Sequence, residues 1–168
     1  TWQDENSVGT IGLAWSKDLI NWEKDTEPIM RPSEIEGTPD FASVTGSYVF
    51  IKDGIYYLFY IGCSEKGYER GIKSLCLATG TDLHNLTRYE NNPIISPSGT
   101  DGSWYKTALW HPYIMEFGGV YYLFINGTGS GEEIGYGMSR DLINWTMFEK
   151  VLSRKSGTGV GMLAGDPI

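Results

Sequence analysis

The sequence is poor in the residues that build metal sites and disulfide frameworks. Its 168 residues include two cysteines, Cys63 and Cys76, and two histidines. These four residues are too scattered for a zinc-binding pattern, and a disulfide framework would normally use more cysteines. We therefore expect no metal and no other cofactor. We interpret both cysteines as small apolar residues, with a single bridge between neighbouring strands as the alternative.

Positive charge and long apolar runs are also scarce. Lys and Arg number 13 against 21 Asp and Glu, so that the formal net charge is −8. Nucleic-acid binding needs clustered Lys and Arg to neutralise phosphates, and an anionic membrane surface attracts the same residues. No apolar run approaches the roughly 20 residues that span a bilayer. We therefore expect neither a nucleic acid nor a membrane as a partner.

Aromatic residues and glycine, in contrast, are abundant. The chain contains 11 Tyr, 6 Trp and 22 Gly, and aromatic residues make up 14% of it. Aromatic side chains favour strands, and glycine supplies the backbone conformations of tight turns. The composition therefore predicts an all-β chain, and no helix of consequence is expected.

A seven-residue segment occurs twice. Ser16-Lys-Asp-Leu-Ile-Asn-Trp22 recurs as Ser139-Arg-Asp-Leu-Ile-Asn-Trp145, and a weaker copy, Thr79-Gly-Thr-Asp-Leu-His-Asn-Leu86, lies between them. Asp and Asn close tight turns with their own side chains, and a tryptophan packs well between neighbouring sheets. We interpret the segment as a structural turn and not as a catalytic motif.

A hairpin pattern is repeated as well. The segment 48–60 matches the segment 113–125, and each has a two-residue turn, Asp53-Gly54 or Gly118-Gly119, of the type that a hairpin requires. The run 56–61 is apolar on both faces, which predicts a central strand covered on both sides. A third strand is predicted near 74–79 and near 133–139, followed by the Asp-Leu turn and a short outer strand.

Repeated four-stranded antiparallel units predict a β-propeller, in which each unit forms one radial blade. The repeat is about 60 residues long, and propellers have roughly four to eight blades. We expect the end of one blade over 1–38, a second blade over 39–98, a third over 99–160 and the start of a fourth over 161–168. Because fewer than three blades cannot close a ring, either the remainder of a longer chain or further copies in a homo-oligomer must complete it.

Several segments match a known family in order. The segment 11–23 is similar to Trp-Gly-His-Ala-x-Ser-x-Asp-Leu-x-x-Trp, and Val44-Thr-Gly-Ser-Tyr-Val49 stands where that family has Phe-Ser-Gly-Ser-Ala. The segments 75–83 and 92–95 follow in the same order. The chain thus resembles the five-bladed propellers of glycoside hydrolase families 32, 43 and 68, and the related family 130.

The resemblance implies an all-β, five-bladed β-propeller built of four-stranded antiparallel blades, with about half of the ring in this chain. It implies a glycoside hydrolase that acts on oligosaccharide or glycan bonds through acid–base chemistry of carboxylates in the central funnel. For such a protein a secreted or periplasmic location is favoured over a cytoplasmic one. The alternatives are a non-catalytic carbohydrate-binding propeller and a scaffold propeller that has lost the carboxylates.

Two family motifs that carry catalytic carboxylates are altered here. Trp110-His-Pro112 stands where the family has Arg-Asp-Pro, so that His111 replaces an aspartate. Gly165-Asp-Pro167 stands where the family has Glu-Cys-Pro or Glu-Gly-Pro, so that Gly165 occupies the position of the glutamate. Asp166 then either takes over its role or matches the Asp-Pro that opens a blade in family 43. The resemblance therefore implies that Asp166 and His111 are the catalytic residues, with turn formation and structural packing as their alternatives.

Six further residues are candidates for substrate binding. Aromatic rings near the third-blade entry can stack on the apolar face of a sugar or pack between blades, and aspartates on the rim loops can contact substrate or serve as surface turns. One serine lies in the segment that matches Phe-Ser-Gly-Ser-Ala. The six candidates are Trp104, Tyr105, Trp110, Asp40, Asp101 and Ser47.

Overall fold

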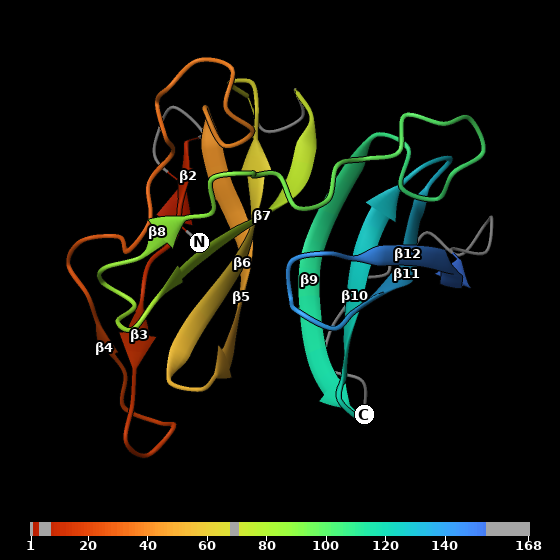
Figure 1. Ribbon diagram of the computed structural model, residues 1–168. Helices are drawn as coiled ribbons and strands as arrows, with labels where there is room; N and C mark the ends of the chain where they lie inside the picture. The colour runs from red at the N-terminus through yellow and green to blue at the C-terminus, as the bar shows by residue number, and fades with distance from the viewer. Residues whose placement is uncertain (1, 4–7, 68–70, 154–168) are drawn as a thin grey trace.

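The computed structural model describes residues 2–3, 8–67 and 71–153 (Figure 1). Within these residues the secondary structure consists of strands and turns without a helix. None of the described segments is therefore a helix that could cross a membrane. The prediction of an all-β chain is confirmed.

Eight consecutive strands form one hydrogen-bonded sheet, which consists of two four-stranded antiparallel halves, each in sequential order. Among the described residues only one parallel pair joins the halves, and we call them the first and the second sheet. The first sheet contains β5 (Ser43–Lys52), β6 (Ile55–Cys63), β7 (Lys73–Gly80) and β8 (Thr87–Arg88). The second contains β9 (Ala108–Phe117), β10 (Val120–Thr128), β11 (Glu132–Ser139) and β12 (Thr146–Ser153). Figure 1 shows them side by side, joined by one parallel pair between Lys73 and Ala108.

Four short strands precede the first sheet and lie on its side away from the second sheet (Figure 1). They form two antiparallel pairs, β1 (Trp2–Gln3) with β2 (Gly9–Thr10) and β3 (Ala14–Trp15) with β4 (Glu23–Lys24). A bridge between Ile11 and Met30 extends this unit. The arrangement is that of three neighbouring propeller blades, the first of them incomplete in the described residues.

Both hairpins turn as their sequences predict. Asp53 and Gly54 have φ angles of 50° and 75°, and Gly118 and Gly119 have φ angles of 61° and 74°. Two successive positive φ angles are typical of the type I′ turn, whose twist matches that of the flanking strands. The turns therefore set the register of both hairpins.

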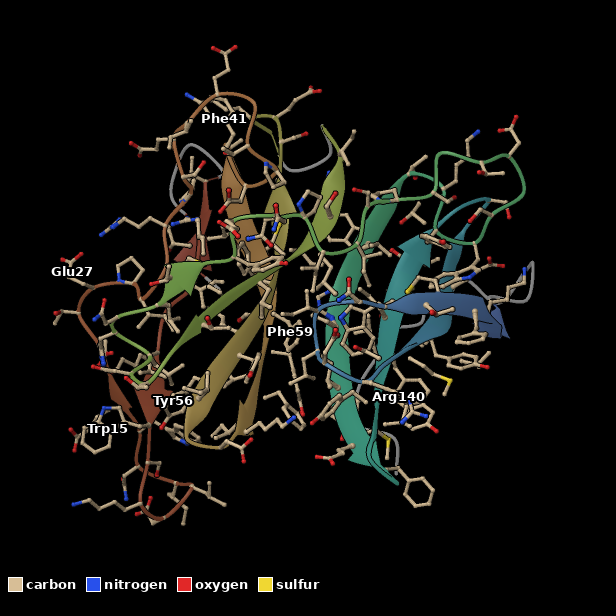
Figure 2. All side chains as sticks on the ribbon, in the orientation of Figure 1. Trp15, Glu27, Phe41, Tyr56, Phe59 and Arg140 are labelled. Carbon is tan, nitrogen blue, oxygen red and sulfur yellow. The ribbon has the colours of Figure 1, made fainter. Side chains whose placement is uncertain are left out.

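The side chains of β6 alternate between two apolar cores. Phe59 and Ile61 belong to the large core between the two sheets, whereas Leu58 and Tyr60 belong to a smaller core against the preceding strands. Figure 2 shows Phe59 in the space between the sheets. Because a strand places alternate side chains on opposite faces, β6 is covered on both sides, as predicted.

The two cysteines are buried and free. On neighbouring strands Cys76 lies opposite Tyr60 and Cys63 lies opposite Lys73, so the two cysteines do not face each other. Burial raises the pKa of both thiols, most strongly that of Cys76. The interpretation as small apolar residues is confirmed, and the disulfide alternative is not.

Candidate functional site

The first strands of the two sheets, β5 and β9, lie next to each other, and we call them the inner strands. Each of them bulges near its start. The pairing of β5 with β6 shifts register between Thr45 and Tyr48. The pairing of β9 with β10 shifts between Trp110 and Tyr113. A bulge bends its strand and redirects the extra residues, so Gly46-Ser47 and His111-Pro112 leave the regular ladders.

The two bulges touch. A Cβ added to Gly46 would lie 3.4 Å from the backbone nitrogen of His111. Gly46 has a φ of 50° and His111 has a φ of 46°, so both backbones are left-handed. For a residue with a side chain this conformation is uncommon, and such strain clusters at functional sites. His111 is also exposed.

Tyr48 holds the two inner strands together directly beyond the bulges. Its hydroxyl donates a hydrogen bond to the carbonyl oxygen of Ile114 at 3.0 Å. Its ring lies edge-on to that of Tyr113, with 5.1 Å between the centroids. These two contacts between the sheets place Ser47 and His111 at the same level of the molecule.

Trp110 lies beside His111 and carries a cation on its ring. Its Nε1 donates a hydrogen bond to the Thr128 hydroxyl at 3.2 Å, and the Nζ of Lys73 lies 5.1 Å from its ring centroid. Lys73 is only 3% exposed, and a desolvated cation over an indole face is a favourable contact. Sequence reasoning missed Lys73. The available signal was a charged residue at the start of an otherwise apolar strand, β7.

We call the group formed by Ser47, Trp110 and His111 the bulge site. It combines a hydroxyl and an imidazole, which can form hydrogen bonds, with an indole ring whose Nε1 is already bonded to Thr128. Neither bulge carries a carboxylate, since the acidic residue nearest to them on these two strands is Glu116, toward the far end of β9. The described residues include no group of three or more His, Cys, Asp or Glu side chains that could hold a metal. The chemistry suits a ligand rich in hydroxyl groups.

The sequence predicts Asp40 on an open rim loop, but the structure places it in the interior. It is 3% exposed, and its carboxylate accepts hydrogen bonds from the Arg88 guanidinium at 2.7 Å and from the Tyr60 hydroxyl at 3.0 Å. Burial, more than the nearby charges, raises the pKa of Tyr60, so the phenol remains a donor. The prediction of a surface position is therefore wrong, because the ion pair with β8 encloses this carboxylate.

The aromatic cluster before β9 is divided between packing and surface. The Trp104 ring is 5% exposed, and its Nε1 donates to the carbonyl oxygen of Phe148 at 3.0 Å. Of the two roles expected for Trp104, stacking on a sugar is therefore wrong and packing is right, because a buried ring has no open face. Tyr105 is half-buried, and its ring centroid lies 4.6 Å from that of Trp104.

The two remaining acidic candidates lie elsewhere. Asp101 is exposed and forms an ion pair with Lys106. Asp166 lies outside the described residues.

A family model described as "Glycosyl hydrolases family 32 N-terminal domain" matches residues 8–163 of the chain. No curated protein sequence matches the chain. Several solved structures match the chain. They include a family 32 β-fructofuranosidase of Bombyx mori, with a TM-score of 0.68 and 21% identity, covering 87% of this chain and 29% of that one.

Two further solved structures match at similar levels. A sucrose-6-phosphate hydrolase of Lactobacillus gasseri has a TM-score of 0.71 and 18% identity, covering 89% of this chain and 30% of that one. A thermostable family 43 glycoside hydrolase has a TM-score of 0.71 and 19% identity, covering 95% of this chain and 52% of that one. The chain therefore has part of a five-bladed β-propeller fold and spans between about three-tenths and one-half of these relatives.

Proposed function

The chain belongs to the glycosyl hydrolase family 32 N-terminal domain family, and from that premise we propose that its bulge site contributes to acid–base cleavage of oligosaccharide or glycan glycosidic bonds. One observation carries the proposal. Two adjacent inner strands bulge at the same level and hold His111 in a left-handed conformation, with its imidazole exposed. Enzyme sites commonly hold residues in such strained conformations.

Glycoside hydrolysis needs one group that donates a proton to the leaving oxygen and one that stabilises or attacks the cationic centre. His111 supplies an imidazole, which donates or accepts a proton near neutral pH. We assign the carboxylate role to Asp166. Ser47 would hydrogen-bond a sugar hydroxyl. Trp110, beside His111 in β9, would line the site with its indole.

The test is a screen of fructosides and other oligosaccharides with the wild-type protein and three variants. His111→Ala and Asp166→Asn should each lower kcat/KM by about 10²-fold or more, the usual contribution of general acid–base groups. Asp53→Asn is the matched control, because Asp53 lies in the hairpin turn at the opposite end of β5. Turnover unchanged in both test variants would rule out the assigned roles.

A second function, carbohydrate binding without turnover, is favoured by one specific observation. His111 stands in β9 where the family has an aspartate, and neither bulge in the described inner strands has a carboxylate. A binding protein needs only the hydrogen-bonding groups and an aromatic platform. Calorimetric titration with oligosaccharides that shows binding without product, weakened by Trp110→Ala and His111→Ala, would select this function over hydrolysis.

A further inference from the structure

The first sheet has a hollow of about 300 Å³ at the end where β5 begins. Its walls are the loop before β5, the end of β6, the start of β7 and the segment after β8. Figure 1 shows the loop before β5 and the start of β7 at the upper end of this sheet. All the lining residues lie within 37–96, and the sheet is packed on both faces. The hollow therefore belongs to one sheet and its own loops.

Hydrogen bonds fix each wall of the hollow. The Thr38 hydroxyl donates to the carbonyl oxygen three residues earlier at 2.8 Å. The Ser64 hydroxyl accepts from the amide of Ile72 at 3.0 Å. The Asn92 side chain accepts from the amide of Leu77 at 2.8 Å and donates to its carbonyl oxygen at 2.9 Å. Because the walls are already ordered, a ligand would bind here without the entropic cost of ordering them.

Ser74 places a hydroxyl group in the hollow. The residue lines the hollow although it is only 2% exposed. Within the described part of the chain no hydrogen bond engages this hydroxyl, whereas every fully enclosed polar side-chain atom there has a partner. The oxygen of Ser74 must therefore open into the hollow. A buried hydroxyl is stabilised by a hydrogen-bond partner, which a ligand in the hollow would supply.

The lining indicates the chemical class of the ligand. None of the described residues that line the hollow is charged, and three serines and one threonine among them carry hydroxyl groups. Pro39, Pro93 and Ile72 add apolar surface. This combination suits a neutral molecule that has several hydroxyl groups and one apolar face, as a sugar ring has. The volume lies at the small end of the roughly 300–1,000 Å³ of ligand sites, which favours a single ring.

We propose that this hollow, which we call the serine hollow, binds one neutral monosaccharide unit. It is separate from the bulge site, because Lys73 contacts Trp110 from one face of β7 and Ser74, the next residue, points to the opposite face. No titratable side chain among the described residues lines the hollow, so the sugar is held there and not cleaved. The choice of a sugar among neutral polyols rests on the proposed function, whereas the position and the neutrality rest on the lining.

NMR titration of the isotope-labelled protein with glucose, mannose and fructose tests the proposal. At least one of these sugars should shift the backbone amide signals of Ile72, Ser74 and Ser96, whereas glucuronate, a charged sugar, should not. Ser74→Ala should raise the Kd about fivefold, the usual contribution of one neutral hydrogen bond. Thr79→Val is the matched control, because it removes a hydroxyl at the opposite end of the same strand, and it should bind like the wild type.

Two further variants make the result specific to the serine hollow. Ser96→Phe places a ring in the hollow from an exposed position and should abolish the shifts without a change in the interior. His111→Ala, in the bulge site, should leave them unchanged.

The outcomes separate this proposal from the proposed function. Amide signals of the hollow that respond to none of the three sugars, or that respond equally in Ser74→Ala, Ser96→Phe and the wild type, would overturn the serine hollow. Sugar-induced shifts confined to Trp110 and His111 would also overturn it, while they would support the bulge site. Shifts at the hollow in a protein that neither binds sugar at the bulge site nor cleaves it would support the serine hollow and contradict the proposed function.

Discussion

At the scale of single residues, Leu19 and Leu142 separate the effect of local sequence from that of packing. They occupy the same position of the same turn and have nearly the same φ angle. Leu142 belongs to the core between the two sheets, whereas Leu19 faces solvent. The difference in their contribution to stability should therefore come from burial alone.

We expect Leu142→Ala to lower the free energy of unfolding by about 3–4 kcal/mol, because a buried leucine leaves both lost apolar contacts and a cavity. Leu19→Ala should change it by less than about 0.5 kcal/mol, as is usual for exposed positions. Urea unfolding at a concentration where the chain is monomeric measures both. Equal losses in the two variants would show that the turn itself, and not the core, depends on leucine.

At the scale of elements, β10 and β11 form a platform for the loop that precedes β9. Gly127 and Gly135 leave the room that the Trp104 ring fills, since an added Cβ would lie 2.5 Å and 2.0 Å from ring atoms of Trp104. The hydrogen bond from the indole to Phe148 then ties the loop to β12. The loop is thus held by one ring inserted over two glycines.

Gly135→Ala should destabilise the protein by about 2–3 kcal/mol, because overpacking forces the ring or the strand to move. Gly131 is the matched control, since an added Cβ there meets nothing within 4 Å, and Gly131→Ala should have little effect. Urea unfolding gives the stabilities, and near-ultraviolet circular dichroism reports the displaced tryptophan. A Gly135→Ala protein as stable as the wild type would contradict the close fit.

At the scale of the whole molecule, an imidazole joins the incomplete first blade to the next one. The Nε2 of His84 lies 2.6 Å from a carboxylate oxygen of Asp25, and its Nδ1 lies 3.2 Å from one of Asp82. Asp25 follows β4, whereas Asp82 and His84 lie in the turn between β7 and β8. Hydrogen bonds to Asp25 and then to Asp82 raise the pKa of His84 above its ordinary value of 6.5.

A raised pKa in the folded state means that His84 stabilises the fold most below its ordinary pKa. That contribution is lost as the pH rises through the raised value. NMR titration should therefore give His84 a pKa above 6.5, and Asp25→Asn should lower it. Asp25→Asn should also cost more stability at about pH 5.5 than at about pH 8.5. The same His84 pKa in both proteins would contradict the contact between the blades.

Much of the fold could be predicted from the sequence, and less of the site. The repeats predicted the hairpins, their turns and the central position of β6, and the resemblance predicted the propeller. Ser47, Trp110 and His111 were named from motif matches, but their proximity depends on the contact between two sheets. Lys73 was missed because its partner Trp110 lies on the other sheet.

The sequence by itself determined the features that rest on contacts within a few residues. The Asp-Leu-Ile-Asn turn takes the same form whether packed or exposed, because its own side chains satisfy its backbone amides. Only the tertiary structure decided which copy of that turn is buried, that Asp40 pairs with Arg88 48 residues away, and that Trp104 packs instead of facing a ligand. These outcomes depend on which surfaces from distant parts of the sequence pack together. The alternation of apolar and polar side chains along a strand does not specify which surfaces those are.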